Sequence, residues 1–291
     1  MSPPPTPFTK LPNGYEIRQL EPKHAKWIQA IAGHTMSFDS PIWCQVGDVK
    51  DRTKRAYQMY EASGPSSELC TQDLASYDLG IEGSLSYGVF LKGHKCNDPE
   101  KEGELKWDLD NPFATREDLL NQMDFPLVSI AMSKDAAIKK SQHPTGLKTW
   151  AEIVDGHKDI SEQLKEGDDR DQSVWAPNIP GKVVHRCGTH TRSDHAGKGL
   201  SKALAHFVMQ KMADLGYEAI LIHTGSEAVN KVWEYPPEPF KSKVIHTFNT
   251  DGFRKENAET KEEYCPFGEK TDNVACKRIW IELPKKGEEK E

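Results

Sequence analysis

The stretch HRCGTHTRSDHAGKGLSKAL, residues 185–204, constrains the fold of this chain more than any other segment. It begins in a run of strand-like residues and passes through two glycines into a helical pattern. Apolar residues at 200, 203, 204, 207, 208, 212 and 215 have the spacing of a half-buried helix. Gly216 follows directly and suits the left-handed residue that ends a helix. The sequence therefore predicts a strand over 183–191, a glycine loop and a helix over 200–215.

The rest of the pattern predicts a mixed α/β protein built on one sheet. Residues 217–224 have the apolar character of a strand inside a sheet. Ser226 is a suitable N-cap for a short helix over 227–235, which Pro236 and Pro237 end. Further strands are predicted over 15–20, 85–93, 104–109, 125–133, 242–250 and 275–283, and further helices over 22–34, 48–63 and 146–165.

The length and the composition of its segments predict one domain with a lead-in, an insertion and a tail. The 291 residues suit a single domain over 14–284, preceded by a proline-rich, disordered lead-in over 1–13 and followed by a charged tail over 285–291. An insertion at about 134–182 carries its own helical pattern, weakened by Gly156. A segment of this length placed before a binding loop could act as a lid.

Composition narrows the class of partner. The net charge of −7 argues against nucleic acid as the main partner. No apolar stretch reaches the roughly 18 to 20 residues that a membrane span needs, and the first residues lack a secretory signal, so we expect a cytoplasmic protein without membrane contact. Six cysteines without a C-x-x-C pair are expected to be free thiols.

Two common phosphate-binding patterns fail on the residues of the glycine loop. A Walker loop needs a glycine where this chain has Arg192, and a serine or threonine where it has Gly199. A dinucleotide-binding loop needs a third glycine where Lys202 stands, and an acidic residue after the next strand, where the chain reads ILIHTGS. The glycines therefore serve a different phosphate group or a plain turn.

The segment DHAGKGL, residues 194–200, is similar to the acyl-CoA loop of the GCN5-related N-acetyltransferases, whose pattern is Q/R-x-x-G-x-G/A between a strand and a helix. Gly197 and Gly199 match both glycines, but Asp194 stands where the family has glutamine or arginine. The order of elements over about 183–235 agrees with the family's core. The resemblance implies a single mixed, mostly antiparallel sheet of about six to seven strands flanked by helices. It also implies acetyl-CoA as acyl donor and the amine of a small molecule as acceptor.

The resemblance assigns the acyl-CoA site to the glycine loop and its surroundings. Backbone N–H groups at a helix N-terminus suit a pyrophosphate, and a side chain on either glycine would obstruct it. Lys198 and Arg192 could add positive charge, and Asn230 could touch the pantetheine arm. The implied residues are Gly188, Thr189, His190, Thr191, Arg192, His195, Ala196, Gly197, Lys198, Gly199, Leu200 and Asn230.

Direct attack of an amine on a thioester needs a base, a site for the oxyanion and an acid. His185 lies where arylalkylamine N-acetyltransferases carry a catalytic histidine, twelve residues before Gly197, so it is the first candidate for the base. His190 is the second, and strand parity predicts it on the opposite face. Backbone N–H groups over 188–191 would hold the oxyanion. Tyr235 is the candidate acid, and carboxylates such as Glu82 and Asp39 stay open as bases.

Other interpretations of the same residues remain. His185, Cys187, His190 and His195 could bind zinc, but their spacing is not that of a zinc site, so no metal is expected. Asp194 and the degraded segment around Tyr235 also fit a non-catalytic CoA-binding or protein-interaction module. The acceptor and the oligomeric state stay open. Aromatic residues that could line an acceptor pocket are Phe38, Trp43, Tyr57, Tyr60, Tyr87 and Phe90.

Overall fold

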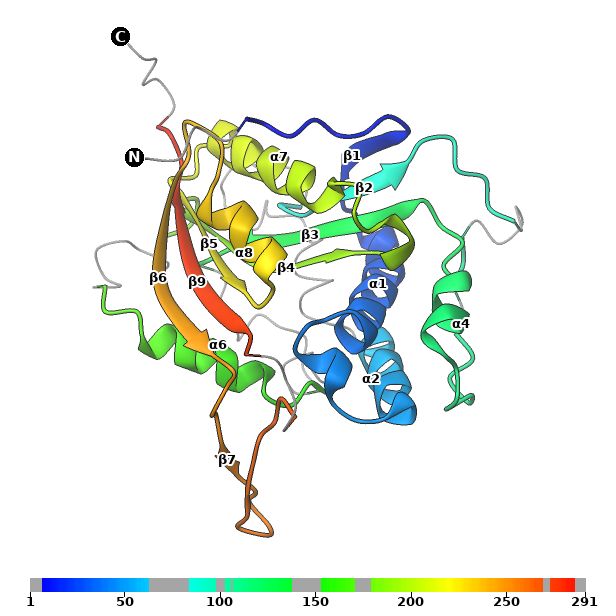
Figure 1. The fold of residues 1–291 in the computed structure, drawn as a ribbon. Helices are drawn as coiled ribbons and strands as arrows, with labels where there is room; N and C mark the ends of the chain where they lie inside the picture. The colour runs from blue at the N-terminus through cyan, green and yellow to red at the C-terminus, as the bar shows by residue number, and fades with distance from the viewer. Residues whose placement is uncertain are drawn as a thin grey trace.

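The computed structural model describes residues 7–62, 84–97, 103–105, 107–137, 153–170, 179–268 and 273–285. These residues form a seven-stranded sheet with helices on both faces (Figure 1). This confirms the predicted α/β class with a single mixed, mostly antiparallel sheet. In spatial order the strands are β1 (Tyr15–Gln19), β2 (Tyr87–Leu91), β3 (Leu127–Asp135), β4 (Val183–Thr191), β5 (Ala219–Thr224), β9 (Ala275–Glu282) and β6 (Lys241–Asn249).

The pairing of β4 with β5 differs from the rest of the sheet. These two strands run parallel, whereas every other neighbouring pair is antiparallel. Their register also ends early: Val183 pairs with Ala219 and Arg186 with Ile222, and β4 then continues for five residues without β5. The sheet therefore opens in its middle, between the end of β4 and the end of β5.

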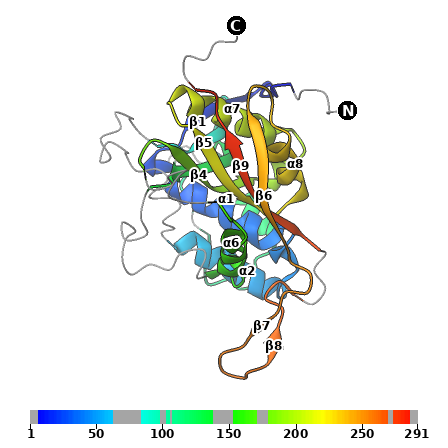
Figure 2. The same ribbon diagram turned by 90° about the vertical axis from the view of Figure 1, so that its left-hand side faces the viewer.

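Two apolar layers hold the helices on the sheet. One layer packs α7 (Leu200–Asp214) and α8 (Glu227–Glu234) on one face, with Trp233 only 1% exposed. The other packs α1 (Ala25–Phe38), α2 (Val49–Glu61) and α6 (His157–Glu166) on the opposite face, and Figure 2 shows α1, α2 and α6 below the sheet. Shorter elements are 3-10 turns at Pro22–His24, Trp43–Gln45 and Ser193–His195, helix α4 (Arg116–Asn121), and a hairpin of β7 (Lys255–Glu256) and β8 (Glu263–Tyr264).

The predicted strand over 104–109 is wrong. The described residues of that segment carry no strand. Leu105 and Trp107 are buried against α2, where the Tyr60 hydroxyl donates to the Leu105 carbonyl at 2.7 Å. Leu105 and Trp107 alternate with polar residues because this irregular segment packs against α2. Alternate residues of any extended chain can face the same neighbour, so alternation alone does not prove a strand.

The helix predicted over 146–165 differs from the structure in its described part. Residues 138–152 lie outside the described residues, and the described helix α6 begins only at His157. Gly156 precedes it with a φ of 77°, a left-handed conformation that cannot continue a helix, so this glycine sets the start of α6.

The structure describes the lead-in from residue 7 onward. It runs along α7 (Figure 1), where the Thr9 amide donates to His206 Nδ1 at 3.0 Å. Phe8 packs edge-on against His206 and Phe240, with ring centroids 5.8 and 5.9 Å away. The first helix is longer than predicted and continues to Phe38.

Two buried histidines are expected to make the fold sensitive to acid. Burial lowers the pKa of His24 and of His206 to about 4 each. An unfolded histidine binds its proton near pH 6.5, so below that pH the unfolded chain holds protons that the folded chain lacks. The free energy of unfolding should therefore fall between pH 6.5 and 4, by up to about 1.4 kcal/mol per pH unit for each histidine. Urea unfolding at pH 7.0, 6.0 and 5.0 measures this slope.

The matched variant for this prediction replaces both His24 and His206 by glutamine, which keeps a hydrogen-bond acceptor but does not titrate. The slope between pH 6.5 and 5 should become shallower in that double variant. An unchanged slope would show that other groups control acid stability.

Candidate functional site

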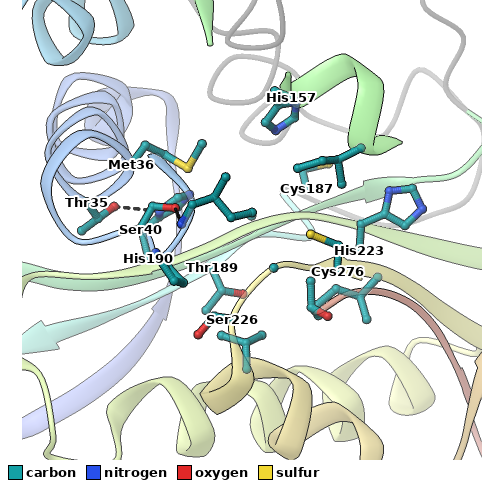
Figure 3. Close-up of a pocket in the computed structure, with 18 of the residues that line it drawn as sticks. Thr35, Met36, Ser40, His157, Cys187, Thr189, His190, His223, Ser226 and Cys276 are labelled. Atoms are coloured by element: carbon teal, nitrogen blue, oxygen red, sulfur yellow. Dashed lines mark hydrogen bonds between the residues drawn. The ribbon is translucent and has the colours of Figure 1, made fainter. Parts of the chain in front are cut away.

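A pocket of about 380 Å³ occupies the opening between β4 and β5. Its walls come from α1 and the loop after it, from α6, from the two strands and from the start of α8. Figure 3 shows polar side chains of these elements gathered around one space. The lining residues discussed below are Thr35, Asp39, Trp43, His157, His185, Arg186, Cys187, Gly188, Thr189, His190, Thr191, His223 and Ser226.

A β-bulge in β4 brings both candidate bases to this pocket. Gly188 pairs with Met132 of β3 and Arg186 pairs with Ser133, so Cys187 is an extra residue without a partner. The extra residue resets the alternation of side chains. His185 and His190 therefore share a face, and the parity argument that placed them on opposite faces is wrong.

Arg186 holds the bulge in place from the other side of the strand. Its guanidinium is 2% exposed and donates to the Met132 carbonyl and, at 2.8 Å, to Ser133 Oγ on β3. The same group donates to the Gly188 carbonyl at 3.2 Å and to Thr189 Oγ1 at 2.7 Å. These bonds tie both sides of the bulge to one rigid, charged group.

The two candidate bases differ in their surroundings. His190 Nδ1 lies 2.7 Å from Thr35 Oγ1 of α1. Burial, and then electrostatic interactions with Arg186 and His157, lower the pKa of His190 to about 4. At neutral pH its ring is therefore uncharged and a weak base. His185 is half-buried, and its ring meets that of His223 edge-to-face, with centroids 5.7 Å apart.

The glycine loop leads from the end of β4 to an uncapped helix. Gly197 and Gly199 each have a φ of +74°, so a residue with a Cβ would be strained at either position. A Cβ built on either glycine meets nothing within 4 Å, which leaves open space in front of the loop. Gly199 is the N-cap of α7 and provides no side-chain cap. The first N–H groups of α7 are therefore available to an anion, as acyl-CoA binding requires.

No family model and no curated protein matches this sequence. Solved structures do match over nearly the whole chain. The C-terminal condensation domain of Ebony, in complex with β-alanyl-dopamine, is 13% identical with a TM-score of 0.54, and the match covers 92% of this chain and 99% of that one. A protein designated arylalkylamine N-acetyltransferase 7, from the yellow fever mosquito, is 8% identical with a TM-score of 0.50, covering 93% and 88%.

This chain has the fold of the GCN5-related N-acetyltransferases. The resemblance predicted from the glycine loop is thus confirmed at the level of the fold. Within the GCN5-related fold, the residues predicted to bind acyl-CoA fall into two groups. Gly188, Thr189, His190 and Thr191 line the pocket, and the others lie on or beyond the loop.

The charges of the loop are arranged differently from the prediction. The Arg192 guanidinium is turned inward, where it donates to the carbonyls of Met123 at 2.9 Å and Phe125 at 3.1 Å. It also donates to Asp194 Oδ2 at 2.7 Å. Arg192, which was expected to bind a phosphate, is therefore bound by groups of the protein itself. Lys198 is exposed, with its Nζ 3.1 Å from the Asp194 carbonyl, and remains available to an anion.

Three more loop positions can be placed. His195 Nδ1 lies 2.8 Å from the Tyr15 hydroxyl, and burial lowers the pKa of its ring. Ala196 is exposed in the turn before Gly197. The Leu200 side chain is 1% exposed in the core under α7, so only its backbone could contact a ligand.

The structure corrects the predictions for Asn230 and Tyr235. Asn230 is buried, accepts from Thr224 Oγ1 and donates to the Ala275 carbonyl at 2.9 Å, so its side chain joins α8 to β5 and β9. Tyr235 follows the last residue of α8 and is 53% exposed, and it is not among the residues that line the pocket. Tyr235 is therefore not placed at the described pocket, where the acid was predicted to lie.

His157 and His223 line the pocket and were missed in the sequence. His157 stacks on Trp43, with centroids 5.7 Å apart, and burial lowers its pKa. Their positions depend on how α6 and β5 meet β4, which no local pattern reports. The available signal was the alternation of YEAILIHT, which could have placed His223 at the end of a buried strand.

Of the aromatic residues predicted to line a pocket, Trp43 does so. The side chains of Tyr57 and Tyr60 pack on Trp107, that of Phe90 lies in the same core, and that of Tyr87 packs on Phe207. Asp39 lines the pocket but is bound by Arg116 at 2.8 Å. Phe38 is partly buried against the core, and Glu82 lies outside the described residues.

Two further findings apply to the described ranges alone. Within them, no three histidine, cysteine, aspartate or glutamate side chains converge as metal ligands would. None of the helices in those ranges combines the length and the apolar character that a membrane span needs.

Proposed function

We propose that this protein is an N-acetyltransferase that transfers the acetyl group of acetyl-CoA directly to the amine of a small molecule. One observation carries the proposal: the open end of β4 joins a pocket with two candidate bases to a glycine loop that leaves a helix N-terminus uncapped. The pocket with its candidate bases suits an amine and a thioester, and the uncapped helix N-terminus suits a pyrophosphate.

The residues divide the chemistry among them as follows. Backbone N–H groups at the start of α7 and Lys198 hold the pyrophosphate. Main-chain groups around the bulge at Cys187 orient the thioester carbonyl and stabilise the oxyanion as the C–N bond forms. His185 takes the proton of the attacking amine. The C–S bond then breaks, and because no tyrosine lines the described pocket, the thiolate takes its proton from His185 or from solvent.

An aromatic amine is the acceptor class that we propose. Trp43 and the apolar side chains of Met36, Ile42 and Val229 line the pocket and suit a flat ring. The solved Ebony domain holds an amide of dopamine, and the mosquito protein carries the designation of an arylalkylamine acetyltransferase, which supports this choice.

Asp194 favours a second candidate function, a CoA-binding or protein-interaction module without catalysis. It puts a carboxylate where the related loop has glutamine or arginine, and Tyr235 lies away from the pocket. Binding of acetyl-CoA without turnover of any amine in a panel would support this second function.

Acetyl-CoA is expected to raise the melting temperature, whereas NADPH and ATP are not. Ligand at 100 times its dissociation constant adds about 2.7 kcal/mol. At roughly 2 to 4 °C per kcal/mol for a domain of this size, the midpoint should rise by about 5 °C or more. A scan with each ligand at saturation measures this shift. No shift with acetyl-CoA would overturn the acetyltransferase and the CoA-binding module, and would leave the protein-interaction module.

A further inference from the structure

His223 makes a ring contact with the proposed base, His185. The two histidines lie on adjacent strands, β4 and β5, close to the point where the strands part, and both line the pocket. Figure 3 shows His223 at this pocket. Their rings meet edge-to-face at 76° with centroids 5.7 Å apart. The orientation of His223 therefore limits the orientations open to His185.

Arg278 of β9 determines which nitrogen of His223 carries the proton. Its Nη1 contacts His223 Nε2, and a guanidinium can only donate. His223 Nε2 must therefore accept, which places the ring proton on Nδ1 and leaves the imidazole neutral.

A buried ion-pair chain holds Arg278 in that position. Arg278 Nε donates to Asp168 Oδ2 at 2.7 Å, and Arg170 binds both oxygens of the same carboxylate at 2.7 Å. Arg278 and Asp168 are only 4% and 8% exposed. Burial alone would raise the pKa of Asp168, but hydrogen bonds from Arg170 and Arg278 outweigh it and hold that pKa far below its usual range.

The groups that face His223 all favour its neutral form. Its pKa lies well below the usual value, and burial is the main cause. Electrostatic interactions with His185 of β4, Arg278 of β9, and Lys165 and His157 of α6 act in the same direction. Asp168 is the carboxylate that binds Arg278, and its charge is shared between two arginines.

We propose that His223 is a positioning residue for His185, held neutral in its Nδ1–H form by the chain Arg278–Asp168–Arg170. This inference rests on the proposed function, in which His185 accepts the amine proton. In this arrangement His223 fixes the ring of the base but takes up no proton itself. Asp168 and Arg170 belong to the segment after α6, and the ion pair between Asp168 and Arg278 joins this segment to β9.

Nitrogen-15 NMR of histidine-labelled protein tests the held ring without any need for activity. Among eleven histidines, the signal of His223 is identified as the one that disappears in His223→Phe. In the wild type it should show the neutral Nδ1–H form from pH 8 down to pH 5.5. In Arg278→Met the Nε2–H form should appear, or the ring should bind a proton at higher pH, while Arg278→Lys should resemble the wild type. A protonated or Nε2–H ring in the wild type at pH 7 would overturn the proposal.

Kinetics tests the effect on His185. His223→Phe should lower kcat for an aromatic amine about tenfold and shift its pH profile, with KM for acetyl-CoA unchanged. His223→Gln, which can still accept from Arg278, should restore most of that loss. Unchanged kcat and pH profile in His223→Phe would refute the positioning role. If the wild type binds acetyl-CoA but acetylates no amine, the proposed function fails, and the NMR result still decides whether the ring is held.

Discussion

Gly199→Val is expected to abolish the binding of acetyl-CoA. The glycine has a φ of +74°, which valine adopts only at a cost of roughly 1–2 kcal/mol, so the turn that exposes the first N–H groups of α7 should change shape. The space that the new side chain would enter is the space proposed for the pyrophosphate. Isothermal titration with acetyl-CoA and the melting shift both measure the loss.

The chain provides a matched control for this experiment. Gly252 has a φ of +73° and nothing within 4 Å of a built Cβ, but it lies in the turn after β6 and outside the pocket lining. Gly252→Val should cost similar stability and bind acetyl-CoA as the wild type does. Equal binding of acetyl-CoA by both variants would show that the glycine loop does not form part of the ligand site.

His185→Gln is expected to lower kcat by about 100-fold or more, the range for loss of a positioned general base. His190→Gln should lower it far less, because a pKa of about 4 makes the ring of His190 a poor proton acceptor. Initial rates of thiol release over a range of amine and acetyl-CoA concentrations separate kcat from KM. His94→Gln, outside the pocket lining, is the control.

The opposite order of effects would reassign the base. A large loss in His190→Gln with full activity in His185→Gln would make the Thr35–His190 pair the proton acceptor. Full activity in both would direct attention to Asp39, the carboxylate of the pocket lining.

The elements around the glycine loop could be predicted because their signals are local. The apolar spacing of α7, the turn at Gly216 and the strand before the loop each depend on neighbours a few residues away. The site could be predicted only in part. Cys187 gives no local sign of a bulge, because the bulge arises from the pairing of β4 with β3.

Long-range partners account for the other errors. Arg192 was expected to meet phosphate, but Met123, Phe125 and Asp194 bind it from a distant loop and from the same turn. Asn230 likewise bonds to β5 and β9. A polar side chain in a motif can serve the ligand or the fold, and its burial decides between them.

The early end of the pairing between β4 and β5 creates a free strand edge inside the molecule. Free edges on a surface invite other chains to pair with them and favour aggregation. Here residues of α1, α6 and the start of α8 line the pocket beside this edge. An extended small ligand that carries amide groups could complete the sheet there, as a peptide does when it adds a strand. Specificity would then come partly from main-chain hydrogen bonds, which side-chain substitution cannot remove.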